Sequence, residues 1–107
     1  MGTVVAISKT NLSVESLLGG RGVLQARPRS PLDWVSAIRR GISSAAVDSL
    51  TKSIRVTQSE LATALGIPER TLARRKKEGV CNSEESAKLV RLARVVERAK
   101  DVFEDFE

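Results

Sequence analysis

The stretch TQSELATALGIPERTLARRKKEG, residues 57–79, places two short helical patterns on either side of one glycine. Thr57 and Glu60 have the T-x-x-E spacing of a capping box, which predicts the start of a helix. Gly66 follows that helix at the point where the chain must turn, and a residue without Cβ adopts the positive φ of such a turn at low cost. A second helix then runs to Gly79. Two short helices joined in this way predict a helix-turn-helix.

The spacing within this stretch supports the same prediction. Gln58, Ala62, Gly66 and Leu72 recur at offsets of 0, 4, 8 and 14 residues. A small residue at Ala62 allows the second helix to cross closely, and Leu72 is predicted to anchor the second helix on the first. In a helix-turn-helix the second helix enters the major groove of DNA, N-terminal end first.

Caps and apolar spacing predict three further helices and therefore an all-α helical bundle. The core must be built from Val, Leu, Ile and Ala, because the chain has only three aromatic residues. The expected boundaries are Ser30 as the cap of a helix ending at Gly41, Ser43 or Ser44 as the cap of a helix through Ile54, and Asn82 or Ser83 as the cap of a long last helix.

We expect three segments: a flexible N-terminal segment 1–30, a helix-turn-helix domain 31–80, and the long helix of 81–107. Within the first segment, SVESLL (residues 13–18) could form one or two helical turns. The following GGRGVLQARPRS has the composition of a linker. Its three arginines could form a basic arm on nucleic acid or belong to a merely soluble linker.

Composition argues against most enzyme chemistry. The chain has no histidine and one cysteine, so a zinc site with the usual nitrogen and sulfur ligands cannot be built. Histidine-based acid–base and nucleophilic catalysis are equally absent. We predict no catalytic residue, metal or cofactor, and a small buried side chain at Cys81. No apolar run is long enough for a membrane span, and the N-terminus lacks signal-peptide features, so the expected location is cytoplasmic.

Charge is distributed unevenly along the chain. Residues 21–77 carry twelve Lys or Arg against four Asp or Glu, a net charge of +8, whereas residues 78–107 carry five against eight, a net charge of −3. A positive block next to an acidic end is typical of a polyanion-binding module joined to something else.

The second helix of the motif carries the candidate readers. Arg70, Arg74 and Lys77 lie at i, i+4 and i+7 and share one face, with further cations on either side of it. Arginine near the start of such a helix can reach the acceptors of guanine with both fork nitrogens, and lysines at its far end meet phosphates. The alternative is a solvated helix end whose cations suit the helix dipole. The candidate DNA-contacting set is Gln58, Glu69, Arg70, Thr71, Arg74, Arg75, Lys76 and Lys77.

An apolar stripe follows the last helix for about five turns. It either closes the core of one chain or pairs with a second chain, and we favour dimerisation because so small a domain can hardly cover it. A two-fold dimer would hold two reading helices roughly 34–36 Å apart on a palindrome. The candidate interface residues are Leu89, Leu92, Val96, Ala99, Phe103 and Phe106.

At this level of detail the chain resembles a known family. SELATALGIPERTLARRKKEG resembles the helix-turn-helix of Xre-type regulators, related to the phage lambda repressor and Cro. The wider run from Ile38 to Asp105, with TLARR followed by the N-S-E-E-S cap and RLARVVERA, resembles the Xre–MbcA–ParS antitoxins, encoded beside toxins of the RES type.

The resemblance implies a homodimeric antitoxin that binds its own operator DNA and represses its operon, with a RES-type toxin that attacks NAD as partner. By the family pattern, Gln58 would contact the DNA backbone, and Glu69, Arg70 and Arg74 would face bases. The long helix and a further C-terminal segment would bind toxin. Two residues depart from the pattern: Pro68 replaces a polar base-contacting residue, and Arg75 replaces an apolar packing residue.

The chain ends at Glu107, before antitoxins of this kind normally end, and we therefore expect a fragment that binds DNA but neutralises toxin poorly. Two rival functions remain open. One is a regulator of the same fold without a toxin partner. The other is a protein-interaction module whose basic face binds an acidic partner.

Overall fold

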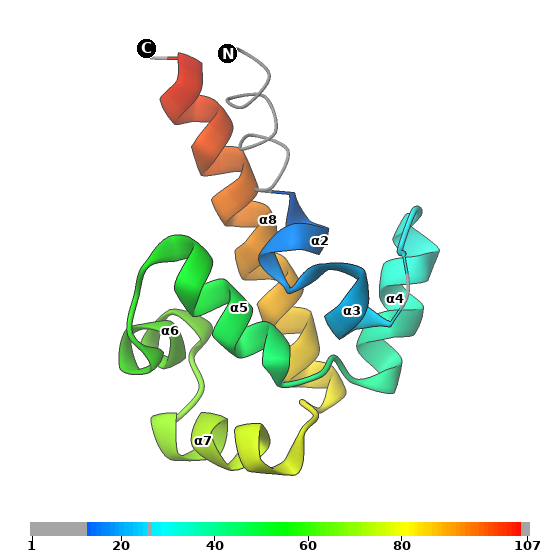
Figure 1. The fold of residues 1–107 in the computed structure, drawn as a ribbon, viewed down its shortest axis with the longest axis vertical. Coiled ribbons are helices and arrows are strands. Elements are labelled where there is room, and N and C mark those ends of the chain that lie inside the picture. The colour runs from blue at the N-terminus through cyan, green and yellow to red at the C-terminus, as the bar shows by residue number, and fades with distance from the viewer. Residues whose placement is uncertain (1–12, 26, 106–107) are drawn as a thin grey trace.

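The computed structural model describes the backbone of residues 13–25 and 27–105, and the side chains as far as residue 99. Its elements are the helices α2 (Val14–Leu17), α3 (Gly20–Leu24), α4 (Pro31–Arg40), α5 (Ala45–Ile54), α6 (Gln58–Leu65), α7 (Glu69–Glu78) and α8 (Ser83–Asp105) (Figure 1). Within the described residues there is no β-strand, only an isolated bridge between Ser43 and Val80. The predicted all-α fold is confirmed.

The predicted helix starts are confirmed by their hydrogen bonds. At α4, the Ser30 hydroxyl accepts from the backbone N–H of Asp33, whose carboxylate accepts from the N–H of Ser30 in return. The backbone N–H of Arg29 donates to the same carboxylate at 2.9 Å, and this bond, followed by that from the N–H of Ser30, lowers the pKa of Asp33. At α6, Thr57 and Glu60 form the predicted capping box, with N···O distances of 2.8 and 3.1 Å.

For α5 and α8, each of which had two predicted cap residues, the structure shows the role of each candidate. At α5, Ser44 occupies the cap position without a side-chain bond, and the hydroxyl of Ser43 accepts from the backbone N–H of Ala45 at 3.2 Å. At α8, the carbonyl oxygen of the Asn82 side chain accepts from the N–H of Glu85 at 2.8 Å, and the Glu85 carboxylate accepts from the N–H of Asn82 at 2.9 Å. Asn82 is therefore the cap of α8.

The predicted glycine turn lies between α6 and α7. Gly66 has φ +70°, in the left-handed region, and its N–H donates to the carbonyl oxygens of the last turn of α6. Ile67, which is buried, donates its own N–H to the carbonyl of Ala62 at 3.0 Å. This arrangement satisfies the free carbonyls at the end of α6 and directs the chain into α7.

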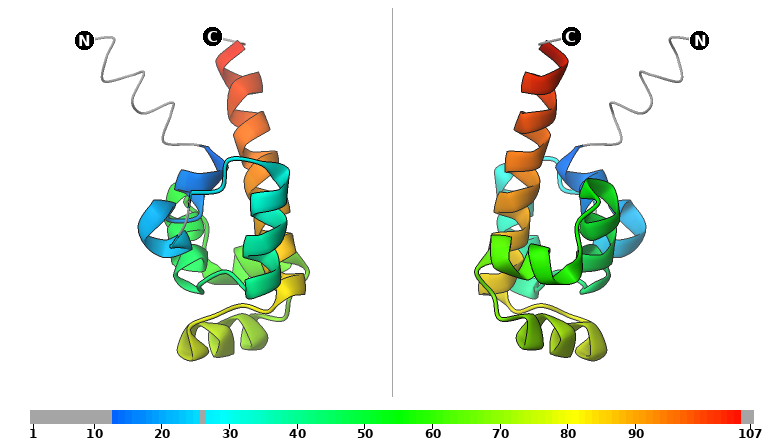
Figure 2. Two further views of the ribbon diagram at one scale, coloured as in Figure 1. Left: turned by 90° about the vertical axis from the view of Figure 1, so that its right-hand side faces the viewer. Right: turned by 90° about the vertical axis from the view of Figure 1, so that its left-hand side faces the viewer.

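Helix α8 is the long element around which the others are arranged. It runs from α7 at one end of the molecule to the C-terminal end at the other, and α2, α4, α5 and α6 pack around its first half (Figures 1 and 2). The buried core joins Leu89, Val90 and Ala93 of α8 to Leu50 of α5 and Leu61 of α6. Within the described residues, no helix is both long and apolar enough to cross a membrane.

The linker predicted from the composition of residues 19–30 is wrong for its first part, and the segment expected to be flexible over residues 1–30 contains two helices, α2 and α3. Residues 20–24 form α3, and Leu17, Leu18 and Leu24 are at most 8% exposed. The physical reason is that α5 and α8 leave apolar surface uncovered, which α2 and α3 cover. Residues 1–12 lie outside the described part of the chain.

The segment that leads into α5, residues 41–44, lies antiparallel to the segment that follows α7, residues 79–81. The N–H of Ser44 donates to the carbonyl of Gly79 at 3.0 Å, and the N–H of Cys81 donates to the carbonyl of Ile42 at 2.9 Å. Gly41 has φ +90°, and a Cβ there would lie 2.5 Å from the carbonyl oxygen of Cys81, so the close approach requires glycine. These bonds fix the end of α7 against the start of α5.

Cys81 is buried, as predicted, with 2% of its surface exposed. Burial disfavours the charged thiolate and raises the pKa of Cys81 to about 11, and the nearby Glu85 carboxylate acts in the same direction. The thiol is therefore neutral and unreactive at physiological pH, which suits a packing role.

The positive φ of Gly66 leads to a stability prediction with an internal control. A Cβ at Gly66 or at Gly22 would meet no atom within 4 Å, but only Gly66 has positive φ. Gly66→Ala should destabilise the fold by about 1–2 kcal/mol, whereas Gly22→Ala, within α3, should be neutral or stabilise it by up to about 1 kcal/mol. Urea unfolding followed by circular dichroism measures both. Equal effects would show that the turn conformation at Gly66 is not required.

Candidate nucleic-acid interface

Helix α7 is the most exposed helix of the motif. It lies at the end of the molecule opposite the C-terminal end of α8 (Figures 1 and 2). Among its residues, all of which the structure describes, Leu72 is the one that is buried, at 1% exposure. The predicted anchor is therefore confirmed, and the remaining turns of α7 offer their side chains to solvent or to polar neighbours.

Four cations of α7 are exposed, and three of them share one face of the helix. Arg70, Arg74 and Lys77 are all exposed, and the Arg74 side chain keeps 61% of its surface accessible. Arg74 reaches the carboxylate of Glu78 only at 4.0 Å, within the same helix. An exposed pair of this kind contributes little to stability, so its cation can be redirected to another anion. These three side chains form the outward basic face of α7.

Arg75 belongs to the predicted DNA-contacting set, but its guanidinium is turned toward the protein. Its Nε donates to Glu85 Oε1 at 2.8 Å and its Nη1 donates to Glu78 Oε1 at 2.9 Å, and 20% of its side chain is exposed. These bonds, that to Glu85 first, raise the pKa of Arg75. The ion pair between Arg75 and Glu85 attaches α7 to α8.

Lys76, predicted to contact phosphate, is also held by neighbouring helices. Its Nζ donates to Gln58 Oε1 at 2.8 Å and lies 2.9 Å from Asp48 Oδ1. The ammonium therefore joins α7 to the first residue of α6 and to the first turn of α5. The bond also fixes the Gln58 amide, whose oxygen is occupied.

The remaining members of the set lie on the first turn of α7. Glu69 is exposed, and its charge complements the N-terminal end of the helix dipole. Thr71 is half-buried beside the anchor Leu72. Of the eight residues proposed from sequence, the structure thus brings Arg70, Arg74 and Lys77 onto the outward face.

The apolar stripe of α8 is divided between two environments. Leu89 is 1% exposed and packs in the core of its own chain, so it is not available to a second molecule. Leu92 and Val96 are half-buried against that core, and Ala99 is exposed. The side chains of Phe103 and Phe106 lie outside the described residues. The first part of the stripe therefore closes the core of one chain.

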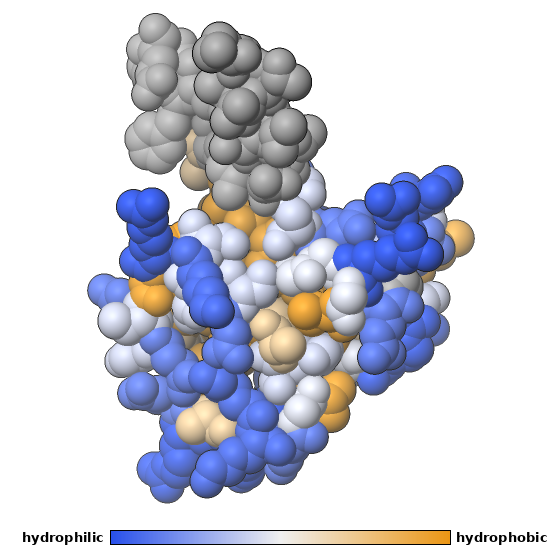
Figure 3. Space-filling model, viewed as in Figure 1, coloured by the Kyte–Doolittle hydropathy of each residue, from blue (hydrophilic) through white to orange (hydrophobic). Residues whose placement is uncertain are grey.

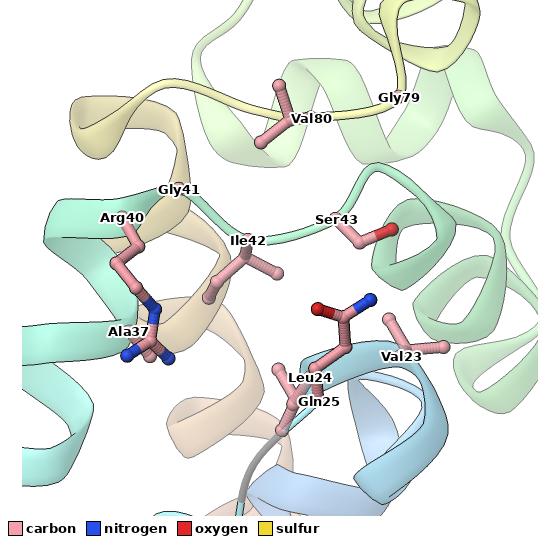
Figure 4. A pocket seen from close by; sticks show the side chains of 10 residues that line it. All are labelled: Val23, Leu24, Gln25, Ala37, Arg40, Gly41, Ile42, Ser43, Gly79 and Val80. Carbon is pink, nitrogen blue, oxygen red and sulfur yellow. The ribbon is translucent and has the colours of Figure 1, made fainter.

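A cavity of about 480 Å³ lies between α3, the end of α4, the segment before α5 and the segment after α7 (Figure 4). Its apolar wall includes Leu24, Ile42 and Val80, and Arg40 and Gln25 supply polar groups. Among the described residues that line it there is no acid, cysteine or histidine. Nowhere in the described part of the chain do three or more potential metal-ligating side chains of the His, Cys, Asp or Glu type cluster together.

The sequence of this region matches a known protein family. The family model of the antitoxin Xre-like helix-turn-helix domain matches residues 33–94, more than half of the chain. The chain belongs to this family. The match begins in α4 and ends within α8, so it covers the helix-turn-helix and the helices that support it. Helices α2 and α3 lie outside it, although they complete the core.

An individual relative supports the same assignment. The chain is similar to Antitoxin Xre of Yersinia enterocolitica serotype O:8 / biotype 1B, with 36% identity over 70 residues. The matched region is 64% of this chain and 47% of that protein, so the chain spans about half the length of the curated relative. No solved structure matches the chain significantly.

Sequence reasoning did not find the polar contacts that hold α7 in this Xre-like domain. The two charges concerned are Arg75 of α7 and Glu85 in the cap of α8. They lie ten residues apart on different helices, and no local pattern links them. Only the packing of α7 beside the first turn of α8 brings the two charges together.

The two adjacent lysines of α7 should differ in their effect on stability. Lys76→Ala removes contacts to α5 and α6 and should lower the free energy of unfolding by about 0.5–1 kcal/mol. Lys77→Ala removes a solvated cation and should change it by less than about 0.5 kcal/mol. Urea unfolding of the two variants at low salt compares them. A larger loss for Lys77→Ala would contradict the contacts described here.

Proposed function

We propose that this chain is the DNA-binding part of an antitoxin of a type II toxin–antitoxin system, and that it represses its own operon by binding operator DNA. The observation that carries the proposal is a difference between the cations of α7. Arg75 and Lys76 are held by the protein, whereas Arg70, Arg74 and Lys77 lie on the outward face of an exposed helix. A helix that reads a DNA groove must be firmly held by the protein, and its cations must be exposed to the DNA.

Position on the helix assigns different roles to the three cations. Arg70 lies in the first turn of α7, the end that enters the major groove, and Arg74 lies one turn later on the same face. Guanidinium forks at these places can pair with O6 and N7 of guanine. Lys77 lies in the last turn, where a cation meets the phosphate backbone. The hydrophilic surface over α7 at the lower end of Figure 3 is consistent with a polyanion-binding face.

Gln58 adds a contact from α6 in this proposal. A phosphate oxygen only accepts hydrogen bonds, so the amide nitrogen is the group that Gln58 offers to it, and the bond from Lys76 to the amide oxygen orients that nitrogen. Gln58 is the first residue of α6, where the N-terminal end of the helix also favours an anion. Lys76 would then act through Gln58 rather than on the DNA.

The partner toxin and the dimer belong to the same proposal. The Yersinia relative is an antitoxin by name, and the resemblance to the Xre–MbcA–ParS group points to a RES-type toxin that degrades NAD. Beyond the core, α8 exposes Val95, at 56%, and Ala99. This apolar surface is suited to a second copy of the chain, and a two-fold dimer would present two α7 helices to a palindromic site.

Substitutions on the outward face of α7 test the DNA-binding part. Arg70→Ala and Arg74→Ala should each weaken binding to the operator by about 1–3 kcal/mol and relax the preference at one base pair. Lys77→Ala should weaken binding to all sequences alike and lower the salt slope of log K by roughly one. Fluorescence anisotropy with single-base-pair variants of the operator measures both effects. Identical behaviour of the three variants would contradict the division of roles.

Two experiments test the function as a whole. Footprinting on the DNA upstream of the chain's own gene should protect a palindrome, with affinity at least about 10³ above that for a scrambled duplex. Co-expression with a RES-type toxin encoded beside the gene tests the partner: the toxin should co-purify with the chain, while cellular NAD recovers little, because we expect this chain to neutralise toxin poorly. Specific DNA binding without any toxin interaction would favour a regulator that has no toxin partner. Equal affinity for both duplexes would reject sequence-specific repression.

A further inference from the structure

The attachment of α7 to α8 depends on one carboxylate oxygen. Oε1 of Glu85 accepts from Arg75 Nε at 2.8 Å and from the backbone N–H of Asn82 at 2.9 Å. The first bond holds the second half of α7, and the second closes the capping box at the start of α8. The Glu85 side chain is 9% exposed, so solvent competes little for either bond.

This oxygen is important because α7 has little apolar surface to hold it. Leu72, in the first half of α7, is its buried side chain, and the second half carries Arg74, Arg75, Lys76 and Lys77 in succession. The direction of that second half is therefore set by polar contacts. Arg75 faces the first turn of α8, and Lys76 faces α5 and α6. Glu85 is the contact on the α8 side.

We propose that Glu85 is a positioning residue for DNA recognition, which acts through Arg75 to set the orientation of α7. The inference rests on the proposed function, because it concerns how the helix that reads DNA is held. It has an unusual consequence. Glu85 is negatively charged and largely buried, and simple electrostatics predicts that removing an acid near DNA raises affinity. If Glu85 positions α7 through Arg75, removing this acid should instead lower the affinity for DNA.

The variant Glu85→Gln keeps the shape of the side chain and an oxygen that can accept from Asn82, but it removes the charge that pairs with Arg75. The matched control is Glu84→Gln, an identical change at the neighbouring exposed acid of the same helical turn. The probes are a labelled duplex from upstream of the chain's own gene and a scrambled duplex of the same composition.

Glu85→Gln should bind the upstream duplex about tenfold more weakly than the unchanged chain, a loss typical of residues that act on a site without touching its ligand. Glu84→Gln should bind as tightly as the unchanged chain or slightly more tightly. Arg75→Gln should lose affinity to the same extent as Glu85→Gln, and the double variant should lose no more than either single one. A positioning role without a phosphate contact predicts that Arg75→Gln keeps the salt slope that Lys77→Gln lowers by about one.

A measurement without DNA separates this inference from the proposed function. Amide hydrogen exchange in the second half of α7 should be faster in both Glu85→Gln and Arg75→Gln, and unchanged in Glu84→Gln. If the unchanged chain does not distinguish the two duplexes, the proposed function fails, and exchange alone still tests whether Glu85 holds α7.

The inference is overturned if Glu85→Gln binds DNA as Glu84→Gln does, or if exchange in α7 is the same in both. Thermal melting confirms that each variant folds before its affinity is compared. Should Glu85→Gln fail to fold, Arg75→Gln decides alone: a reduced salt slope would make Arg75 a phosphate contact and reject the positioning role. An unchanged slope with weaker specific binding would support it.

Discussion

A helix that presents its cations to a polyanion has little apolar surface with which to hold its own position. In α7 the buried contact is Leu72, and the rest of the attachment is polar. The bond from Arg75 to Glu85, the contacts of Lys76 with α5 and α6, and the backbone bonds of residues 79–81 hold the second half of the helix. The proposed readers depend on this arrangement, because their direction follows that of α7.

The same constraint explains the architecture around α7. A helix held by polar contacts needs a rigid support, and α8 supplies it by running through the core with Leu89, Val90 and Ala93 buried. Its first turn carries Glu85, so the helix that organises the core also holds the helix proposed to read DNA. The buried hydroxyl of Ser86, one residue later, accepts from the N–H of Ile42 at 2.8 Å and fixes the segment that leads into α5.

The N-terminal helices show why a family match does not define a complete core. The family model begins in α4, yet Leu17 of α2 and Leu18, which follows that helix, are fully buried. A small helical domain buries only a modest share of its surface, and each further apolar side chain removed from water adds to its stability. In this chain α2 and α3 contribute such side chains, and α3 comes from a stretch whose glycines and arginines have the composition of a linker.

Local rules of sequence were sufficient for the helices of the motif. The caps Ser30 and Thr57, the turn at Gly66 and the anchor Leu72 were predicted because each depends on residues a few positions apart. The helical class of the fold, and the Xre-like resemblance that the family match confirms, followed from the same patterns. The face formed by Arg70, Arg74 and Lys77 follows from helical periodicity, although its contact with DNA remains a prediction.

Tertiary structure decided the distinctions between residues that look alike in sequence. Arg74 and Arg75 are adjacent arginines, yet one is open to solvent and the other is paired with Glu85, because the partner comes from a different helix. Lys76 and Lys77 differ for the same reason. The apolar stripe of α8 has one period, but packing assigns Leu89 to the core and leaves Ala99 exposed. By itself the sequence determined which residues share a helix and a face. Which of those charges and apolar groups have a partner was determined only by the packing of the helices, because the partners are distant along the chain.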